Sequence, residues 1–185
     1  MSRMQIVFLI FLALSPGFQN LLAQQPGIEK VRDQFFAMDK SDGSALKLYK
    51  SLEKSDLSKH PVLLAYRGAA SAASAGSVSG VFKKLDYFNQ GKSELEKAVI
   101  LNPLDPEIRF LRLATQVSAP GFLGYASDIR NDKARIINTF NGVNANHPNA
   151  YLYLRICRFM QSHAELNETE KNTVNQLVVK FNTGK

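Results

Sequence analysis

Apolar residues recur at helical spacing along almost the whole chain, and short breakers separate the apolar stretches. The first stretch, after Gly27, carries one apolar face made of Ile28, Val31, Phe35 and Phe36. A recurrence at i, i+3 and i+4 lets a helix bury one side, whereas a half-buried strand would alternate at every second residue. No convincing strand alternation occurs in the sequence. We therefore predict an all-α fold of about seven helices between residues 27 and 183, packed as antiparallel hairpins because the connections are short.

Glycine, proline and asparagine mark the predicted boundaries. Ser58 is expected to cap a helix that has Pro61 in its first turn and continues to Gly76. The next helix spans roughly residues 81–101, with Gly91 as a kink or junction. After a helix that follows Pro106, residues 118–125 are expected to be non-helical. The remaining helices are predicted over 128–140, 148–161 and 168–181.

The tract from Gly68 to Gly76 consists only of glycine, alanine and serine. Small residues let helix backbones approach closely, which is common inside membranes. Lys59, His60 and Arg67 interrupt this region, and its hydrophobicity is mediocre. We therefore expect a tightly packed helix in a water-soluble core.

The first 23 residues have the layout of a secretory signal peptide. Arg3 supplies a positive charge, residues 6–14 are free of polar side chains, and Ser15–Gly17 breaks the helix before Ala23. The apolar run is far shorter than the roughly 20 residues of a membrane span, so a retained anchor is the weaker alternative. No cysteine follows the run, so the thiol needed for lipoprotein anchoring is missing. The sequence predicts a signal peptide over 1–23 and a single exported helical domain over 24–185, periplasmic or extracellular.

The chain is basic, with a formal net charge of +7, of which Arg3 of the leader contributes one. A basic exported protein can bind anionic surfaces or polymers, but no block of five or six like charges marks a dedicated patch. Solubility is the preferred explanation, and we expect no nucleic-acid partner and no stable membrane insertion after cleavage. Cys157 is the only cysteine, so no intramolecular disulfide forms. Its apolar neighbours predict a buried thiol rather than a nucleophile.

One segment has the spacing of a helical repeat. Gly91, Leu95, Ala98 and Pro103 match a small residue, a large apolar residue, an alanine and a terminal proline at fixed offsets. This segment resembles the second half of a tetratricopeptide repeat, with Ser79 and Phe82 standing in for residues of the first helix. The resemblance covers one repeat unit, and no 34-residue period extends across the chain. It implies tetratricopeptide-like hairpins rather than a regular array.

A longer set of segments is similar to a family of uncharacterised exported bacterial proteins. These segments are His60-Pro61, Tyr66-Arg67-Gly68, Pro106 to Arg112, and Pro120 to Tyr125. The resemblance implies a bacterial envelope origin and supplies no activity.

The sequence contains none of the common catalytic signatures. His60, His147 and His163 lie near predicted helix ends or turns, outside any zinc-binding spacing. There is no nucleophile elbow, P-loop or dinucleotide-binding glycine motif. We therefore predict no catalytic residues, no metal site and no cofactor.

The strongest candidate site is a group of three arginines with a loop tyrosine. Arg109 and Arg112 are three residues apart, so they share a helix face, and this face lies among apolar residues. A partly buried guanidinium requires a carboxylate or an anionic ligand. The preferred interpretation is structural: pairs with Asp86, Asp128 or Asp132 lock the helix to the 120–132 region. In the alternative, Arg67, Arg109, Arg112 and Tyr125 line a site for an anion or a partner.

Two functions of different classes follow from these observations. The leading hypothesis is an exported, non-enzymatic helical scaffold that binds an unknown envelope protein or peptide, because stacked hairpins leave a concave surface. The alternative is a basic binder of an anionic small molecule or envelope polymer through Arg67, Arg109 and Arg112. Convergence of these guanidinium groups on an open cleft would favour the alternative, whereas carboxylate partners would count against it.

Overall fold

The computed structural model describes residues 27–38 and 42–183, so the predicted leader lies outside the described residues. Within these two ranges the chain forms eight α-helices and one short 3-10 turn, and no β-strand. The all-α prediction is confirmed, with one helix more than the seven expected. The elements are α1 (Ile28–Phe36), α2 (Ser44–Glu53), α3 (Pro61–Ser74), α4 (Val81–Leu101), α5 (Pro106–Ser118), η2 (Gly121–Leu123), α6 (Ile129–Gly142), α7 (Ala150–His163) and α8 (Glu168–Thr183).

Local chemistry explains where several helices begin. Pro61 and Pro106 are the first residues of α3 and α5, where the missing amide hydrogen removes no helical hydrogen bond. Asp105 caps α5 by accepting hydrogen bonds from two amides of the first turn, at 2.8 and 3.2 Å. The prediction that Ser58 caps α3 is wrong, because the residue before this helix is His60, which makes no side-chain capping bond.

Two glycines bring α3 and α4 into close contact. A Cβ atom on Gly91 would lie 2.5 Å from the amide nitrogen of Ala72 and would overlap the carbonyl oxygen of Gly68. The expectation that the small-residue tract packs tightly in the core is confirmed. Of the two predictions for Gly91, a kink or a junction, the junction is wrong, because α4 continues as one helix through this residue. The helix that packs against α4 is α3. Ser79 and Phe82, expected in a separate first helix, instead lie just before α4 and in its first turn, and Phe82 is 85 % exposed.

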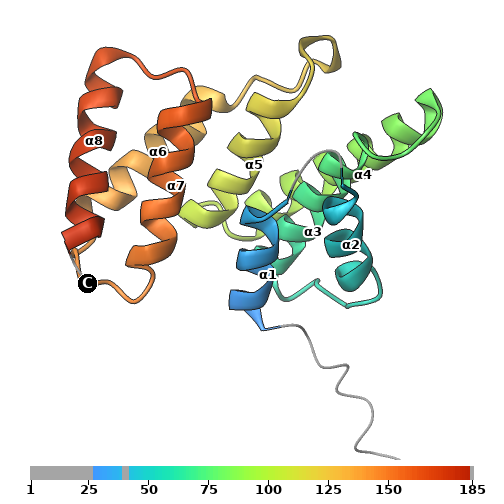
Figure 1. Cartoon of the computed structure of the whole chain (residues 1–185), viewed down its shortest axis with the longest axis horizontal. Coiled ribbons are helices and arrows are strands. Elements are labelled where there is room, and N and C mark those ends of the chain that lie inside the picture. The colour runs from blue at the N-terminus through green and yellow to red at the C-terminus, as the bar shows by residue number, and fades with distance from the viewer. Residues whose placement is uncertain (1–26, 39–41, 184–185) are drawn as a thin grey trace, which may run out of the picture.

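The helices from α2 to α6 pack in chain order, each against the next, and α7 and α8 form a further hairpin (Figure 1). Helix α3 packs most extensively against α4. Helix α6 packs mainly against α5 and α8, and α7 reaches α5, so the last hairpin closes the end of the row. Helix α1 lies at the side of this row, against α2 and α3.

One apolar core runs from Val31 of α1 to Phe181 of α8. A smaller cluster, made of Ala72, Phe88 and Tyr125, holds the loop that contains η2 against α3 and α4. Within the described ranges, no helix is both long enough and apolar enough to cross a membrane.

Candidate functional site

The predicted arginine pair on α5 meets a carboxylate inside the protein. Asp132 of α6 has no exposed side-chain surface, and Arg112 donates two hydrogen bonds of 2.8 Å to it. Arg109, one helical turn earlier, donates a third hydrogen bond of 2.9 Å to the same carboxylate. Charge-assisted, bidentate bonds of this kind are the strong class of protein hydrogen bonds. They join α5 to α6.

A second carboxylate extends this cluster to α4 and to the loop before α6. Arg112 donates to Glu96 of α4 at 2.7 Å, and the hydroxyl of Tyr125 donates to the other oxygen of Glu96 at 2.7 Å. Burial raises the pKa of Tyr125, and the hydrogen bond to Glu96 raises it further. Burial opposes the charge on Arg112, but its carboxylate partners hold the pKa above the ordinary value. Tyr125 is therefore a neutral donor and Arg112 a cation at every physiological pH.

We call the five residues Glu96, Arg109, Arg112, Tyr125 and Asp132 the Asp132 cluster. The preferred interpretation of the two arginines as structural ion pairs is confirmed for Asp132, and Asp128 lies 3.5 Å from Arg112. Asp86 is the exception among the proposed partners, because it is exposed on α4 and takes no part in the cluster.

Arg67 does not join the Asp132 cluster, unlike in the four-residue site that the sequence left as the alternative. Its Nε atom donates to Glu94 of α4 at 3.0 Å, and Nη1 donates to the carbonyl oxygens of Leu52 and Ser55 at 3.4 and 3.2 Å. This side chain therefore ties α3 to α4 and to the end of α2. Since all three guanidinium groups meet carboxylates, the geometry counts against an open anion site.

Sequence reasoning missed a second buried cluster, centred on Glu107 of α5. Arg32 of α1 donates to its two carboxylate oxygens at 2.8 and 2.6 Å, and the hydroxyl of Tyr66 of α3 donates to one of them at 2.7 Å. Only 5 % of Glu107 and 8 % of Arg32 is exposed. A signal was present in the sequence, because Arg32 occupies the apolar face of the first helix, between Val31 and Phe35.

The electrostatics of this Glu107 cluster fix the charge states of Arg32 and Tyr66. The hydrogen bonds to Glu107 raise the pKa of Arg32 above its ordinary value, although burial acts in the opposite direction. Burial raises the pKa of Tyr66, and the nearby carboxylate adds to this effect. Arg32 is thus a permanent cation and Tyr66 a permanent neutral donor.

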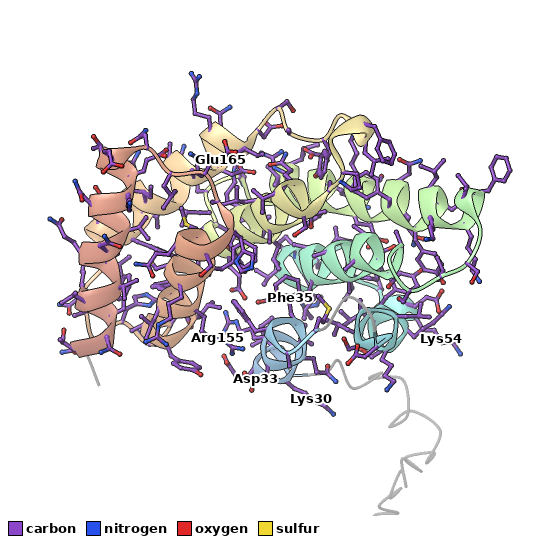
Figure 2. The ribbon with its side chains drawn as sticks, turned by 45° about the horizontal axis from the view of Figure 1, so that its top comes forward. Lys30, Asp33, Phe35, Lys54, Arg155 and Glu165 are labelled. Atoms are coloured by element: carbon purple, nitrogen blue, oxygen red, sulfur yellow. The ribbon has the colours of Figure 1, made fainter. Side chains whose placement is uncertain are left out.

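Aromatic rings surround the Glu107 cluster, and together they form the surface on which the Arg32–Phe36 part of α1 packs. We call this surface, made of Tyr66, Glu107, Phe110 and Arg155, the seat of α1. Phe35 meets Tyr66 edge-on at a centroid distance of 5.3 Å, and Phe36 stacks on Phe110 of α5 at 5.5 Å. Arg155 of α7 lies 4.0 Å from the ring centre of Phe36 and donates to Asp33 at 2.8 Å. Figure 2 shows Arg155 and Asp33 facing each other across the gap between α7 and α1. Side chains of α3, α5 and α7 therefore hold α1 against the rest of the protein.

A pocket of about 240 Å³ opens beside this seat, between the start of α1 and the start of α7. Its charged lining residues include Glu29 and Asp33 as acids and Arg32 and Arg155 as bases. Opposite charges are therefore balanced around its walls. Tyr151, also in the lining, is 57 % exposed at the pocket.

The other candidate residues lie where the sequence placed them. His60 and His163 flank helix ends, and His147 lies in the turn before α7, stacked on Tyr153 with ring centres 5.1 Å apart. Cys157 has no exposed surface, which confirms the prediction of a buried thiol, and burial raises its pKa to about 12. In the part of the chain that the structure describes, no group of three or more His, Cys, Asp or Glu residues could hold a metal ion.

Comparisons with protein-family models, with curated proteins and with solved structures find no match to this chain.

Proposed function

We propose that this chain is a non-enzymatic helical scaffold, exported to the bacterial envelope, that binds a protein or peptide partner. The observation that carries the proposal is the seat of α1. Helices α3 and α5 present a buried carboxylate, a tyrosine hydroxyl and aromatic rings to one short amphipathic helix, and α7 adds the guanidinium of Arg155. Laying the apolar face of a helix into a groove is a common mode of peptide recognition.

Exposed apolar side chains provide further contact area. Phe82 and Phe122 are each 85 % exposed, and Ile100, at the other end of α4, is 78 % exposed. Large exposed apolar groups that gather in patches mark interaction surfaces, whereas single ones are common on any protein. Phe82 and Ile100 lie at opposite ends of α4 and Phe122 lies in η2, so they serve as secondary contacts in this proposal.

Export is part of the proposal and has its own test. A leader that ends at Ala23 leaves only Gln24, Gln25 and Pro26 before Gly27, the residue that precedes α1. The exported protein is therefore expected to begin at or near Gln24, a few residues before the helix that occupies the seat. N-terminal sequencing of secreted material measures this directly. An intact Met1 on a membrane-bound product would refute export with cleavage.

Site-specific photo-crosslinking in the producing cell tests partner binding. A photoreactive phenylalanine analogue replaces Tyr151, which lines the pocket beside α1, and in a matched control it replaces the exposed Asn172 of α8. We expect one discrete protein adduct at position 151 and none at position 172. Equal labelling at both positions, or none at either, would contradict the proposal, as would substrate turnover by the purified protein.

A further inference from the structure

The seat of α1 has a strict electrostatic requirement. Glu107 is 5 % exposed, and its two oxygens accept three hydrogen bonds, two of them from Arg32. A buried carboxylate without a cation is strongly unfavourable, so an occupant that covers Glu107 without supplying a cation would leave it uncompensated. Arginine matches the site better than lysine, because its planar fork reaches both carboxylate oxygens at once. An occupant that supplies a guanidinium group therefore fits this seat best.

The apolar part of the seat fixes the spacing of two aromatic side chains. Phe35 and Phe36 follow Arg32 by three and four residues, which places all three on one face of α1. Their ring partners, Tyr66 and Phe110, belong to α3 and α5. In Figure 2, Phe35 lies on the side of α1 that faces the green helices of the row. The seat therefore selects an arginine followed at +3 and +4 by aromatic rings.

Helix α1 has the properties of a replaceable occupant. Its outer residues Glu29, Lys30, Asp33 and Gln34 are exposed, so no other described element covers it. It has only nine residues, a length at which an isolated helix is marginal in water. It is therefore held mainly by the side chains that enter the seat.

We infer that the face on which α1 packs, formed by α2, α3, α5 and α7, is a binding site for a helical segment of a partner protein that presents a guanidinium followed at +3 and +4 by aromatic rings. Helix α1 is its built-in occupant, which the partner segment displaces. This inference rests on the proposed function and names the chemistry of the partner. Charge complementarity at Glu107 carries it, together with the aromatic spacing.

A peptide binding assay with the whole chain tests the inference. The probe is a fluorescent synthetic peptide with the sequence of residues 27–38, and its anisotropy reports binding. In the chain variant Arg32→Ala/Phe36→Ala, the internal helix loses its anchors, and we expect the peptide to bind. The unmodified chain should bind the peptide more weakly, because its tethered helix competes at an effective concentration of about millimolar.

Peptide variants separate specific recognition from unspecific apolar binding. Arg32→Ala in the peptide should weaken binding about tenfold or more, since it removes the charged hydrogen bonds to Glu107. Lys30→Ala in the peptide is the matched control, because this side chain is exposed on α1, and it should leave affinity unchanged. Equal binding by the Arg32→Ala peptide would overturn the inference.

A second chain variant covers loss of folding. If circular dichroism shows that the double variant is unfolded, the single variant Phe36→Ala retains the Arg32–Glu107 pair and is used instead. Failure of the unmodified peptide to bind a folded variant would overturn the inference, and so would a stable dimer that exchanges α1 between copies. Because the assay needs no natural partner, crosslinking at Tyr151 without peptide binding would refute this recognition rule and leave the proposed function standing.

Discussion

Replacing Arg112 with alanine tests whether the Asp132 cluster stabilises the fold. The Arg112 side chain is 4 % exposed, and its guanidinium makes bonds of 2.8, 2.8 and 2.7 Å to Asp132 and Glu96. Breaking a buried ion pair by removing one partner costs about 3–5 kcal/mol, because a charge remains buried without compensation. Arg109 still lies 2.9 Å from Asp132. We therefore expect a loss near the lower limit, about 3 kcal/mol.

Urea unfolding followed by far-ultraviolet circular dichroism measures this loss. For a slope of about 2 kcal/mol per molar urea, the unfolding midpoint should fall by about 1.5 M at unchanged slope. Arg135→Ala is the matched control, because this arginine is exposed on α6, and its free energy of unfolding should stay within about 0.5 kcal/mol. An unchanged midpoint for Arg112→Ala would refute the structural role of the pair.

A double variant tests the physical reason for the loss. Asp132→Ala combined with Arg112→Ala removes the buried carboxylate together with its main cation. The double variant should therefore lose less free energy of unfolding than the sum of the two single variants, because neither charge is left without the other. Strictly additive losses would refute the argument that uncompensated burial causes the instability.

Three further predictions follow from the packing and the titrating groups. Gly91→Ala should destabilise the fold by about 3 kcal/mol in the same urea assay, because the new Cβ meets backbone atoms of α3. In the control Gly142→Ala, the new Cβ enters open space, and the change should be neutral or stabilising by up to about 1 kcal/mol. Cys157 should resist a thiol reagent at neutral pH until the chain unfolds, since its pKa is about 12, and rapid native labelling would contradict its burial. Burial alone would raise the pKa of Glu170, but hydrogen bonds from Lys133 and a backbone amide lower it below 4.5. Stability from this pair should be present above pH 4.5 and decline as the pH falls below it, and Glu170→Gln should flatten this part of the profile of unfolding free energy against pH.

Local signals in the sequence sufficed for the helices and for part of one cluster, the pairing of Arg109 and Arg112 with an aspartate, but not for Glu96. Apolar periodicity and breakers placed the helices because a helix needs only neighbours three and four residues away. An aspartate partner for Arg112 was predictable for a similar reason, since Asp132 lies on the next helix along the chain. Gly91 shows the limit of such signals. A glycine inside a helix indicates either a break or a close approach, and only the position of α3 decides between them.

Contacts between distant segments could not be predicted. Arg32 and Glu107 are 75 residues apart, and no local pattern indicates that α1 returns to α5. The sequence grouped Arg67 with the α5 arginines by residue type alone, although its partner Glu94 lies on a part of α4 that faces α2 and α3. Glu94 of α4 and Asp132 of α6 were both candidate partners for Arg67 when only the sequence was considered. The choice among them depends on helix rotation, which the periodicity of one segment does not fix.

The two buried carboxylates, Asp132 and Glu107, differ in how much of the fold must open before each can be separated from its arginine partner. Asp132 joins α5 to α6, and through Arg112 it reaches Glu96 of α4, so all its partners lie in consecutive helices of one packed row. Opening this cluster requires the row itself to separate. Glu107 instead faces Arg32 on α1, a short helix whose outer side is exposed. Its cation can leave with one peripheral helix, and the row of α2 to α6 need not open. The carboxylate that can exchange its partner at the lower structural cost is therefore Glu107, and this is why the binding site is assigned there.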